Sequence, residues 1–167
     1  TAFETLLKLF DEVSTIKAIK DWCNDPMLHE KHIRVFQSLP NPVNVLTTHS
    51  AWLMSSLVMG ANGLLSGAGS VIAPLQVRLF NAIKNNNLEE AKDINDKIFP
   101  LVQLFYKPPF LDMHNRMKET LVILNAIQKA VVRPPLVKLP FKEIEELKKT
   151  VNNINLDNKL NFVQTVA

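Results

Sequence analysis

The chain has 167 residues, of which 47% are hydrophobic, 21% charged and 7% aromatic, as is typical of a globular protein with a buried core. This composition excludes a disordered or collagen-like chain, and no run reaches the roughly 18 uncharged apolar residues of a membrane span. Lys and Arg exceed Asp and Glu by only three, 19 against 16, and are dispersed, so neither nucleic acid nor a membrane is an expected partner. A single cysteine, Cys23, excludes an internal disulfide and favours a reducing cytoplasmic location.

Helix and strand patterns alternate through the first part of the chain. Apolar periodicity predicts a helix at 3–10, a strand at 16–20, a helix at 26–39, a strand at 43–47, a helix at 51–59 and a strand at 63–66. Asp25 is expected to cap the second helix, because its side chain is able to accept hydrogen bonds from the free N–H groups of the first turn. Pro26 is expected as the first residue of the helix, since the N–H that proline lacks would have no partner within the helix at that position. Such alternation predicts a parallel sheet with right-handed crossovers.

The second part of the chain reads as helical. Helices are expected behind Pro74, after Asn87, from about Phe110 and from near Pro140. Asn87 with Glu90 three residues later is a capping-box pattern, which predicts where the second of these helices begins. Three strands do not close a (β/α)8 barrel, which takes roughly 250 residues. The strands therefore belong either to a small open sheet or to the later part of a barrel whose first strands lie elsewhere.

Lys20 is the first candidate for a catalytic residue, because active sites of α/β proteins form where parallel strands end. Strand alternation places Ile16, Ala18 and Lys20 on one side and Lys17 and Ile19 on the other. A lysine amine in a partly dry pocket attacks carbonyl groups and forms a Schiff base. The alternative on position alone is an ordinary lysine at a strand end, with its charged head in water.

Other polar side chains suggest simpler roles. His29 and His32 lie three residues apart, which is not the spacing of a zinc-protease helix, and no third ligand is near in sequence, so we interpret them as solvated and expect no metal. Asp112, His114 and Arg116 predict an exposed polar cluster that serves as a surface or subunit contact.

Five segments, taken in order, resemble one known family. They read IKAIKDWCND at 16–25, GANGLLS at 60–66, IAP at 72–74, NLEEA at 87–91 and IFPL at 98–101. The first is similar to the lysine strand of the dihydrodipicolinate synthase and N-acetylneuraminate lyase family, the next two to its last barrel strand and the following helix, and the others to its C-terminal helices. The resemblance covers nearly the whole chain.

This resemblance implies a fold and a reaction. Residues 1–72 would be a partial (β/α)8 barrel, holding strands six to eight, and 73–167 the last barrel helix and a C-terminal helical region. Lys20 would form a Schiff base with pyruvate or another 2-keto acid, and the resulting enamine would add to an aldehyde, or the reverse cleavage would occur. The family implies no metal or organic cofactor, and assembly of the C-terminal helices into a homo-oligomer.

The resemblance also implies which residues bind substrate. Leu65 and Ser66 would line the 2-keto-acid site. Thr47, Thr48 and His49 lie at and just beyond the end of the predicted seventh strand, where the family places the contacts that discriminate the second substrate. They lack the Gly-Asp pattern typical of dihydrodipicolinate synthases, so another aldehyde or a sugar acid is an equally good expectation.

Two parts of the family's machinery have no counterpart before Lys20. The threonine pair that holds the keto-acid carboxylate and the proton-relaying tyrosine come from earlier strands, and the only tyrosine here, Tyr106, falls in the helical part. We therefore expect that an N-terminal barrel half completes the enzyme. The alternatives are a non-catalytic paralogue or half-barrel that binds a partner through its strand edge, and an unrelated small α/β binding protein.

Overall fold

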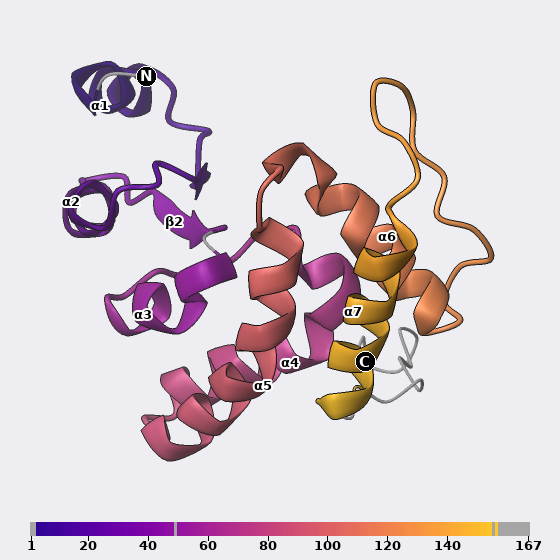
Figure 1. Ribbon diagram of the computed structural model, residues 1–167. Helices are drawn as coiled ribbons and strands as arrows, with labels where there is room; N and C mark the ends of the chain where they lie inside the picture. The colour runs from indigo at the N-terminus through magenta and orange to yellow at the C-terminus, as the bar shows by residue number, and fades with distance from the viewer. Residues whose placement is uncertain (1–2, 49, 155, 157–167) are drawn as a thin grey trace. The chain divides into compact units, whose positions relative to one another are not determined.

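The computed structural model describes residues 3–48, 50–154 and 156 (Figure 1). Contacts group the chain into two compact units. The first comprises Thr1–Gly67 and Leu79–Ala91, and the second comprises Ala68–Arg78 and Lys92–Ala167. The sequence-based division between residues 72 and 73 stays a prediction.

The first unit holds every strand of the described residues. In chain order its elements are α1 (Phe3–Glu12), β1 (Ala18–Asp21), α2 (Pro26–Phe36), β2 (Asn44–Thr47), the 3₁₀ helix η1 (Ser50–Trp52), α3 (Leu53–Val58) and β3 (Gly63–Leu64). The strands pair in parallel in the order β1-β2-β3, with Lys20 opposite Leu46 and Leu46 opposite Gly63. The predicted parallel sheet is therefore confirmed, with a shorter third strand than expected.

The two faces of this sheet have different surroundings. Helices α2 and α3 pack against β2 (Figure 1), and Val45 and Thr47 of β2 are fully buried. Ala18 and Lys20 of β1 and Asn44 of β2 are exposed. Since successive residues of a strand point to opposite faces, one face is covered by helices, and in the described part of the chain the other, with Ala18, Lys20 and Asn44, is largely uncovered.

The core of the first unit is built around Phe36 of α2. Its ring is fully buried, meets Phe10 of α1 edge-on at 4.9 Å between centroids, and stacks on Phe3 at 5.3 Å. Burying a side chain of this size stabilises the fold by about 1.5–3 kcal/mol. The aromatic contacts thus fasten α1 to α2 beside the sheet.

The start of α2 follows its sequence signals. Oδ1 of Asp25 accepts hydrogen bonds from the backbone N–H of Met27 at 2.9 Å and of Leu28 at 3.2 Å, and Pro26 is the first helical residue. Asn24 has a positive φ of 56°. The predicted cap is confirmed, and it sets the direction of α2 relative to the end of β1.

Helices α4 (Gly69–Lys84) and α5 (Leu88–Tyr106) contribute to both units. The helix expected behind Pro74 begins earlier, and its backbone is kinked at Ile72, two residues before the proline. Ile72 lies in the turn before Pro74, which a proline disturbs because its ring crowds that turn and it has no N–H to bond back to it. Ahead of α5, Oδ1 of Asn87 accepts from the Glu90 N–H at 3.2 Å, so the predicted cap is confirmed.

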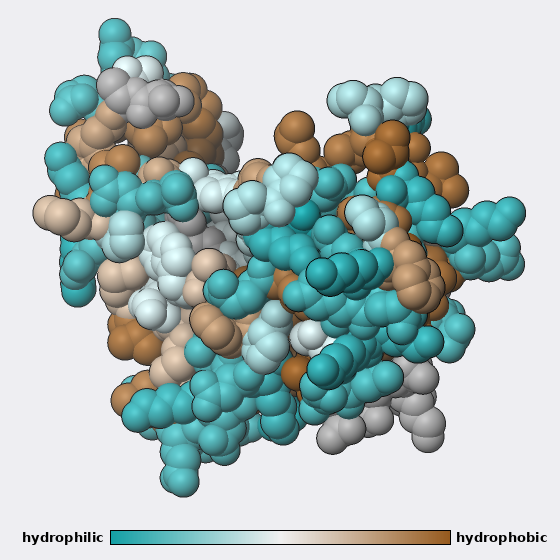
Figure 2. All heavy atoms as spheres, viewed as in Figure 1, coloured by the Kyte–Doolittle hydropathy of each residue, from teal (hydrophilic) through white to brown (hydrophobic). Residues whose placement is uncertain are grey.

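The second unit contains the remaining helices, η2 (Phe110–Asp112), α6 (Met113–Ile123) and α7 (Phe141–Asn153). Leu147 and Val151 of α7 are buried, whereas its outer face is charged and hydrophilic (Figure 2). The expected amphipathic helix is therefore confirmed. Among the described residues, no helix is both long and apolar enough to cross a membrane.

The exposed cluster expected at residues 112–116 is wrong for Arg116. This guanidinium is fully buried, and Nη1 donates to the carbonyls of Phe105 at 3.1 Å and Lys107 at 2.6 Å. Nε donates to Glu143 of α7. An arginine is buried here because carbonyl and carboxylate oxygens meet its donors.

Candidate active site

Lys20 lies near the carboxyl end of β1, on the uncovered face of the sheet. Its side chain is exposed and its Nζ lies 5.9 Å from the centroid of the Trp22 ring. Ala18 and Lys20 are exposed, whereas Asp21 is buried, as the expected alternation requires. The catalytic role of Lys20 stays a prediction.

The neighbouring residue, Asp21, points to the covered face and is only 4% exposed. Its Oδ2 accepts hydrogen bonds from Nδ1 of His29 at 2.6 Å and Nδ1 of His32 at 2.8 Å. Both histidines lie on α2 and are buried, so their interpretation as solvated residues is wrong. The physical reason is that α2 aims both rings at a carboxylate that only the fold brings close.

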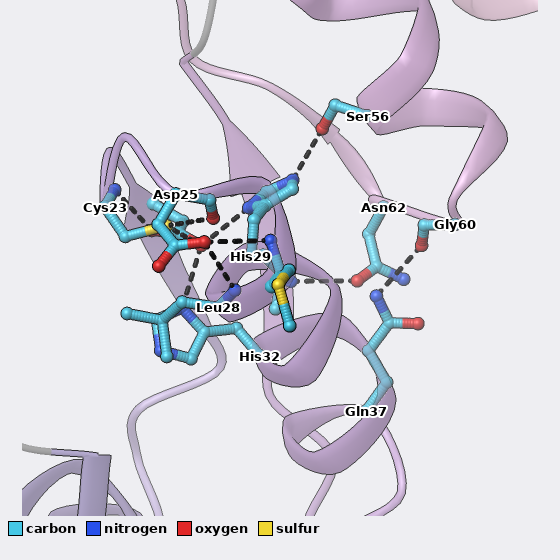
Figure 3. Close-up of polar contacts among 12 residues, drawn as sticks. Cys23, Asp25, Leu28, His29, His32, Gln37, Ser56, Gly60 and Asn62 are labelled. Atoms are coloured by element: carbon cyan, nitrogen blue, oxygen red, sulfur yellow. Dashed lines mark hydrogen bonds and ion pairs between the residues drawn. The ribbon is translucent and has the colours of Figure 1, made fainter.

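Burial raises the pKa of Asp21, but the hydrogen bonds from His29 and His32 outweigh it and hold this pKa far below its usual range. Asp21 is therefore a carboxylate, and each Nδ1 atom carries the hydrogen that it donates. Nε2 of His29 lies 2.6 Å from Oγ of Ser56, which joins α3 to the network (Figure 3). These hydrogen bonds thus link the end of β1 to α2 and, through His29, to α3.

Cys23 lies beside this network and is half-buried. Its backbone N–H donates to Asp21 Oδ1 at 3.0 Å, and its Sγ lies 3.8 Å from Asp21 Oδ2. The same Sγ lies 3.2 Å from the carbonyl oxygen of Asp25 (Figure 3). Burial, with the nearby Asp21 carboxylate, raises the pKa of the thiol to about 11. The free thiol is therefore protonated at neutral pH.

The fold brings most of the expected substrate-binding residues to the same edge of the sheet. Thr48 is buried and its N–H donates to the Asp21 carbonyl at 3.3 Å. Leu65 is 50% exposed, and its N–H donates to the Thr47 carbonyl at 2.8 Å. Oγ of Ser66 lies 2.5 Å from Oγ of Ser50.

Two of the expected binding residues stand apart. The side chain of Thr47 is fully buried and belongs to the covered face, opposite to that of Lys20. His49 lies outside the described residues. The binding roles of Thr47, Thr48, His49, Leu65 and Ser66 remain predictions.

Sequence reasoning missed the network of Asp21 and Ser56 with the two histidines. One signal was available, because alternation along β1 turns Asp21 away from Lys20 and towards the helix that follows. No such signal in the sequence pointed to Ser56, since it lies 27 residues from His29 and only the packing of α3 brings the two together.

The sequence profile of the Dihydrodipicolinate synthetase family matches residues 2–154. The chain belongs to this family. Among curated relatives, the 4-hydroxy-tetrahydrodipicolinate synthase of Chlorobaculum parvum is 25% identical over 154 residues, which are 92% of this chain and 49% of the relative. The synthase of Chlorobium luteolum is 30% identical over 100 residues, or 60% of this chain and 33% of the relative. The chain spans about half the length of most of the curated relatives it matches.

Solved structures of this family share the fold. Dihydrodipicolinate synthase from Thermotoga maritima matches with a TM-score of 0.80 at 20% identity, over 92% of this chain and 50% of that one. A prophage protein of the family from E. coli K12, solved in complex with pyruvate, matches with a TM-score of 0.78 at 23% identity, over 89% of this chain and 49% of that one. The described strands and helices therefore correspond to about half of a family fold.

Proposed function

We propose that this chain supplies the lysine half of a Schiff-base carbon–carbon lyase that acts on pyruvate or another 2-keto acid. The observation that carries the proposal is the position of Lys20, at the carboxyl end of a parallel strand and on the uncovered face of the sheet, in a chain of the dihydrodipicolinate synthetase family. Strands β1, β2 and β3 would be the sixth, seventh and eighth strands of a (β/α)8 barrel, whose active sites form at that end.

In this proposal the Lys20 amine attacks the keto carbon of the 2-keto acid. A C–N bond forms and water leaves, which gives a protonated imine that withdraws electrons from the neighbouring carbon. Loss of a proton from that carbon gives an enamine, and its attack on an aldehyde carbon forms the new C–C bond. Water then hydrolyses the imine and frees Lys20, so no metal or organic cofactor takes part.

The backbone at Leu65 and Ser66 would line the 2-keto-acid site, and Thr47, Thr48 and His49 would influence the choice of second substrate. Support comes from the hydrogen bonds that hold β3 to β2 and place Leu65 at the same sheet edge as Lys20.

The proposed partner, an N-terminal barrel half, would bind to the uncovered face of the sheet. Ala18, Lys20 and Asn44 are exposed there, whereas the inner face of a closed barrel is packed with side chains. An N-terminal barrel half would cover this face and supply the groups that bind the keto-acid carboxylate and transfer protons. The family resemblance further suggests a homo-oligomer built through the C-terminal helices.

The test is borohydride trapping with pyruvate, read by peptide mass spectrometry, on this chain alone and together with the first half of a family barrel. We expect a reduced adduct on the peptide of Lys20 that requires or is strongly increased by the added half. Lys20→Ala should abolish it, and the matched control Lys17→Ala, at an exposed lysine just before β1, should keep it.

An adduct spread equally over Lys17 and Lys20 would contradict the proposal, as would no adduct with a barrel half shown to be bound. The second of these results favours the other function, a non-catalytic half-barrel that binds a partner through the uncovered face and strand edge.

A further inference from the structure

We propose that Asp21, Cys23, His29 and His32 form a binding site for one divalent transition-metal ion of the zinc class. The site lies on the covered side of β1, away from the face that carries Lys20, and it is independent of the proposed lyase function. His29 and His32 alone lack the further ligands that a metal ion needs. The fold supplies these ligands from the end of β1 and the turn that follows it.

The positions of the ligand atoms suit such an ion. One ligand atom each from Asp21, Cys23 and His29 all lie within 4.8 Å of one another. Nδ1 of His32 lies 2.8 Å from the same carboxylate oxygen, Oδ2 of Asp21, that Nδ1 of His29 contacts. Zinc bonds of about 2.0–2.3 Å place neighbouring ligand atoms roughly 3–4 Å apart. Separations of up to 4.8 Å among Asp21, Cys23 and His29 must therefore contract by up to roughly 1–2 Å, and His32 joins this set of three through Asp21 Oδ2.

The donor set selects the type of metal. One thiol, two imidazole rings and one carboxylate are ligands of Zn²⁺ and Co²⁺, whereas Mg²⁺ and Ca²⁺ prefer oxygen atoms throughout. Three of the four residues, Asp21, His29 and His32, are buried, and Cys23 is half-buried, which leaves the thiol side as the route of entry.

The metal-free network has hydrogens where metal bonds would form. Both Nδ1 atoms donate a hydrogen towards Asp21 Oδ2, and the Cys23 thiol lies 3.8 Å from the same oxygen. When the ion binds, the thiol loses its proton to water and becomes a thiolate. Each imidazole likewise frees the Nδ1 atom that binds the ion, by passing the hydrogen it carries there to Nε2 or to water.

Ser56 gives His29 a partner in both states. Its hydroxyl lies 2.6 Å from Nε2 of His29 and is able either to donate to a bare Nε2 or to accept from an Nε2–H. Ligating histidines commonly hold such a partner on their second nitrogen, which fixes the ring orientation and the tautomer. The hydrogen bond to Ser56 therefore prepares His29 for the ion.

The full chain, freed of metal with a chelator, is titrated with Co²⁺ and followed by absorption spectroscopy. We expect one ion per chain, visible bands of tetrahedral Co²⁺ and a sulfur-to-cobalt charge-transfer band in the near ultraviolet. Zn²⁺ should displace the Co²⁺ and remove the bands, because it forms more stable complexes with such ligands.

Cys23→Ser should abolish the charge-transfer band and weaken cobalt binding by at least about tenfold. His32→Gln should weaken cobalt binding by a similar factor. His114→Gln, which changes an exposed histidine in the second unit, is the matched control and should bind like the wild type. Lys20→Ala should also bind normally, which separates this proposal from the lyase function. Circular dichroism of each variant verifies that it folds.

Three results would overturn the proposal. They are the absence of a 1:1 cobalt complex in the folded chain, a complex without the charge-transfer band, and a charge-transfer band that survives in folded Cys23→Ser. A fourth result, loss of binding in folded His114→Gln, would also overturn it, because it would identify an adventitious surface complex.

Discussion

Asn24 determines how the chain leaves β1 and enters α2. Its φ of 56° lies in the left-handed region, which costs most residues about 1 kcal/mol or more but is accessible to glycine and asparagine. The next residue, Asp25, caps α2, and the backbone N–H of the preceding Cys23 binds Asp21. One unusual backbone conformation therefore places His29 and His32 relative to Asp21.

Replacing Asn24 tests this requirement. Asn24→Val should lower the free energy of unfolding by about 1–2 kcal/mol, because a β-branched residue is strained at positive φ, and Asn24→Gly should leave it equal or slightly higher. Urea unfolding followed by circular dichroism measures both. Asn85→Val, at an asparagine without positive φ, is the control and should change the stability by less than about 0.5 kcal/mol. Equal losses at the two positions would contradict the argument.

Single residues show how far sequence reasoning reached. The position of Lys20 at a strand end and its side of the sheet followed from period-two alternation, and the Asp25 cap followed from local backbone chemistry. The burial of His29 and His32 did not, because their partner Asp21 lies outside their helix. Ser56 and Arg116 were missed or misread for the same reason, since their partners are distant in sequence and meet only after packing.

At the scale of elements, one arginine connects three segments of the second unit. Arg116 of α6 binds the carbonyls of Phe105, at the end of α5, and of Lys107 just beyond it, together with the Glu143 carboxylate of α7. The guanidinium is fully buried and the Glu143 side chain is 18% exposed. Loss of the cation would leave a partly buried carboxylate and three carbonyl groups, those of Phe105, Lys107 and Pro108, without this donor.

Arg116→Met should therefore destabilise the chain by about 3 kcal/mol or more. Thermal unfolding followed by circular dichroism measures the loss. Arg34→Met is the matched control, because that arginine is 67% exposed and pairs with Glu30 on the surface of α2. It should cost less than about 0.5 kcal/mol. A similar small effect at Arg116 would show that its contacts contribute little.

At the scale of the whole molecule, the outer edge of β1 is the feature that we expect to determine association with other chains. The carbonyl of Lys17 accepts from Asn44 of β2 and that of Asp21 from Thr48 just after it. In a parallel ladder the backbone groups of Ala18 and Lys20, which alternate with these, therefore face away from β2. In the described part of the chain β1 is an edge strand. Such edges pair readily with another chain.

We expect the chain to self-associate as its concentration rises, measured by light scattering. Ala18→Pro should reduce this association, because proline removes the N–H at the edge and is tolerated in edge strands. Ala18→Ser keeps the N–H and should associate like the wild type. A purified N-terminal barrel half should suppress the association of the wild type and of Ala18→Ser, which both keep the N–H at residue 18. Association that is unchanged in Ala18→Pro would place the contact elsewhere.

The opposite directions of Lys20 and Asp21 protect the strand register. Sliding β1 by one residue against β2 would exchange the two faces of the strand. The Lys20 ammonium group would then lie between β1 and α2, where the two imidazole rings present N–H donors and no acceptor to it. The Asp21 carboxylate would lose its hydrogen bonds from His29 and His32. Burying an unpaired charge costs several kcal/mol, so the shifted pairing is strongly disfavoured. A pair of adjacent, oppositely charged side chains thus aligns this short strand, which four residues of backbone pairing alone would hold weakly.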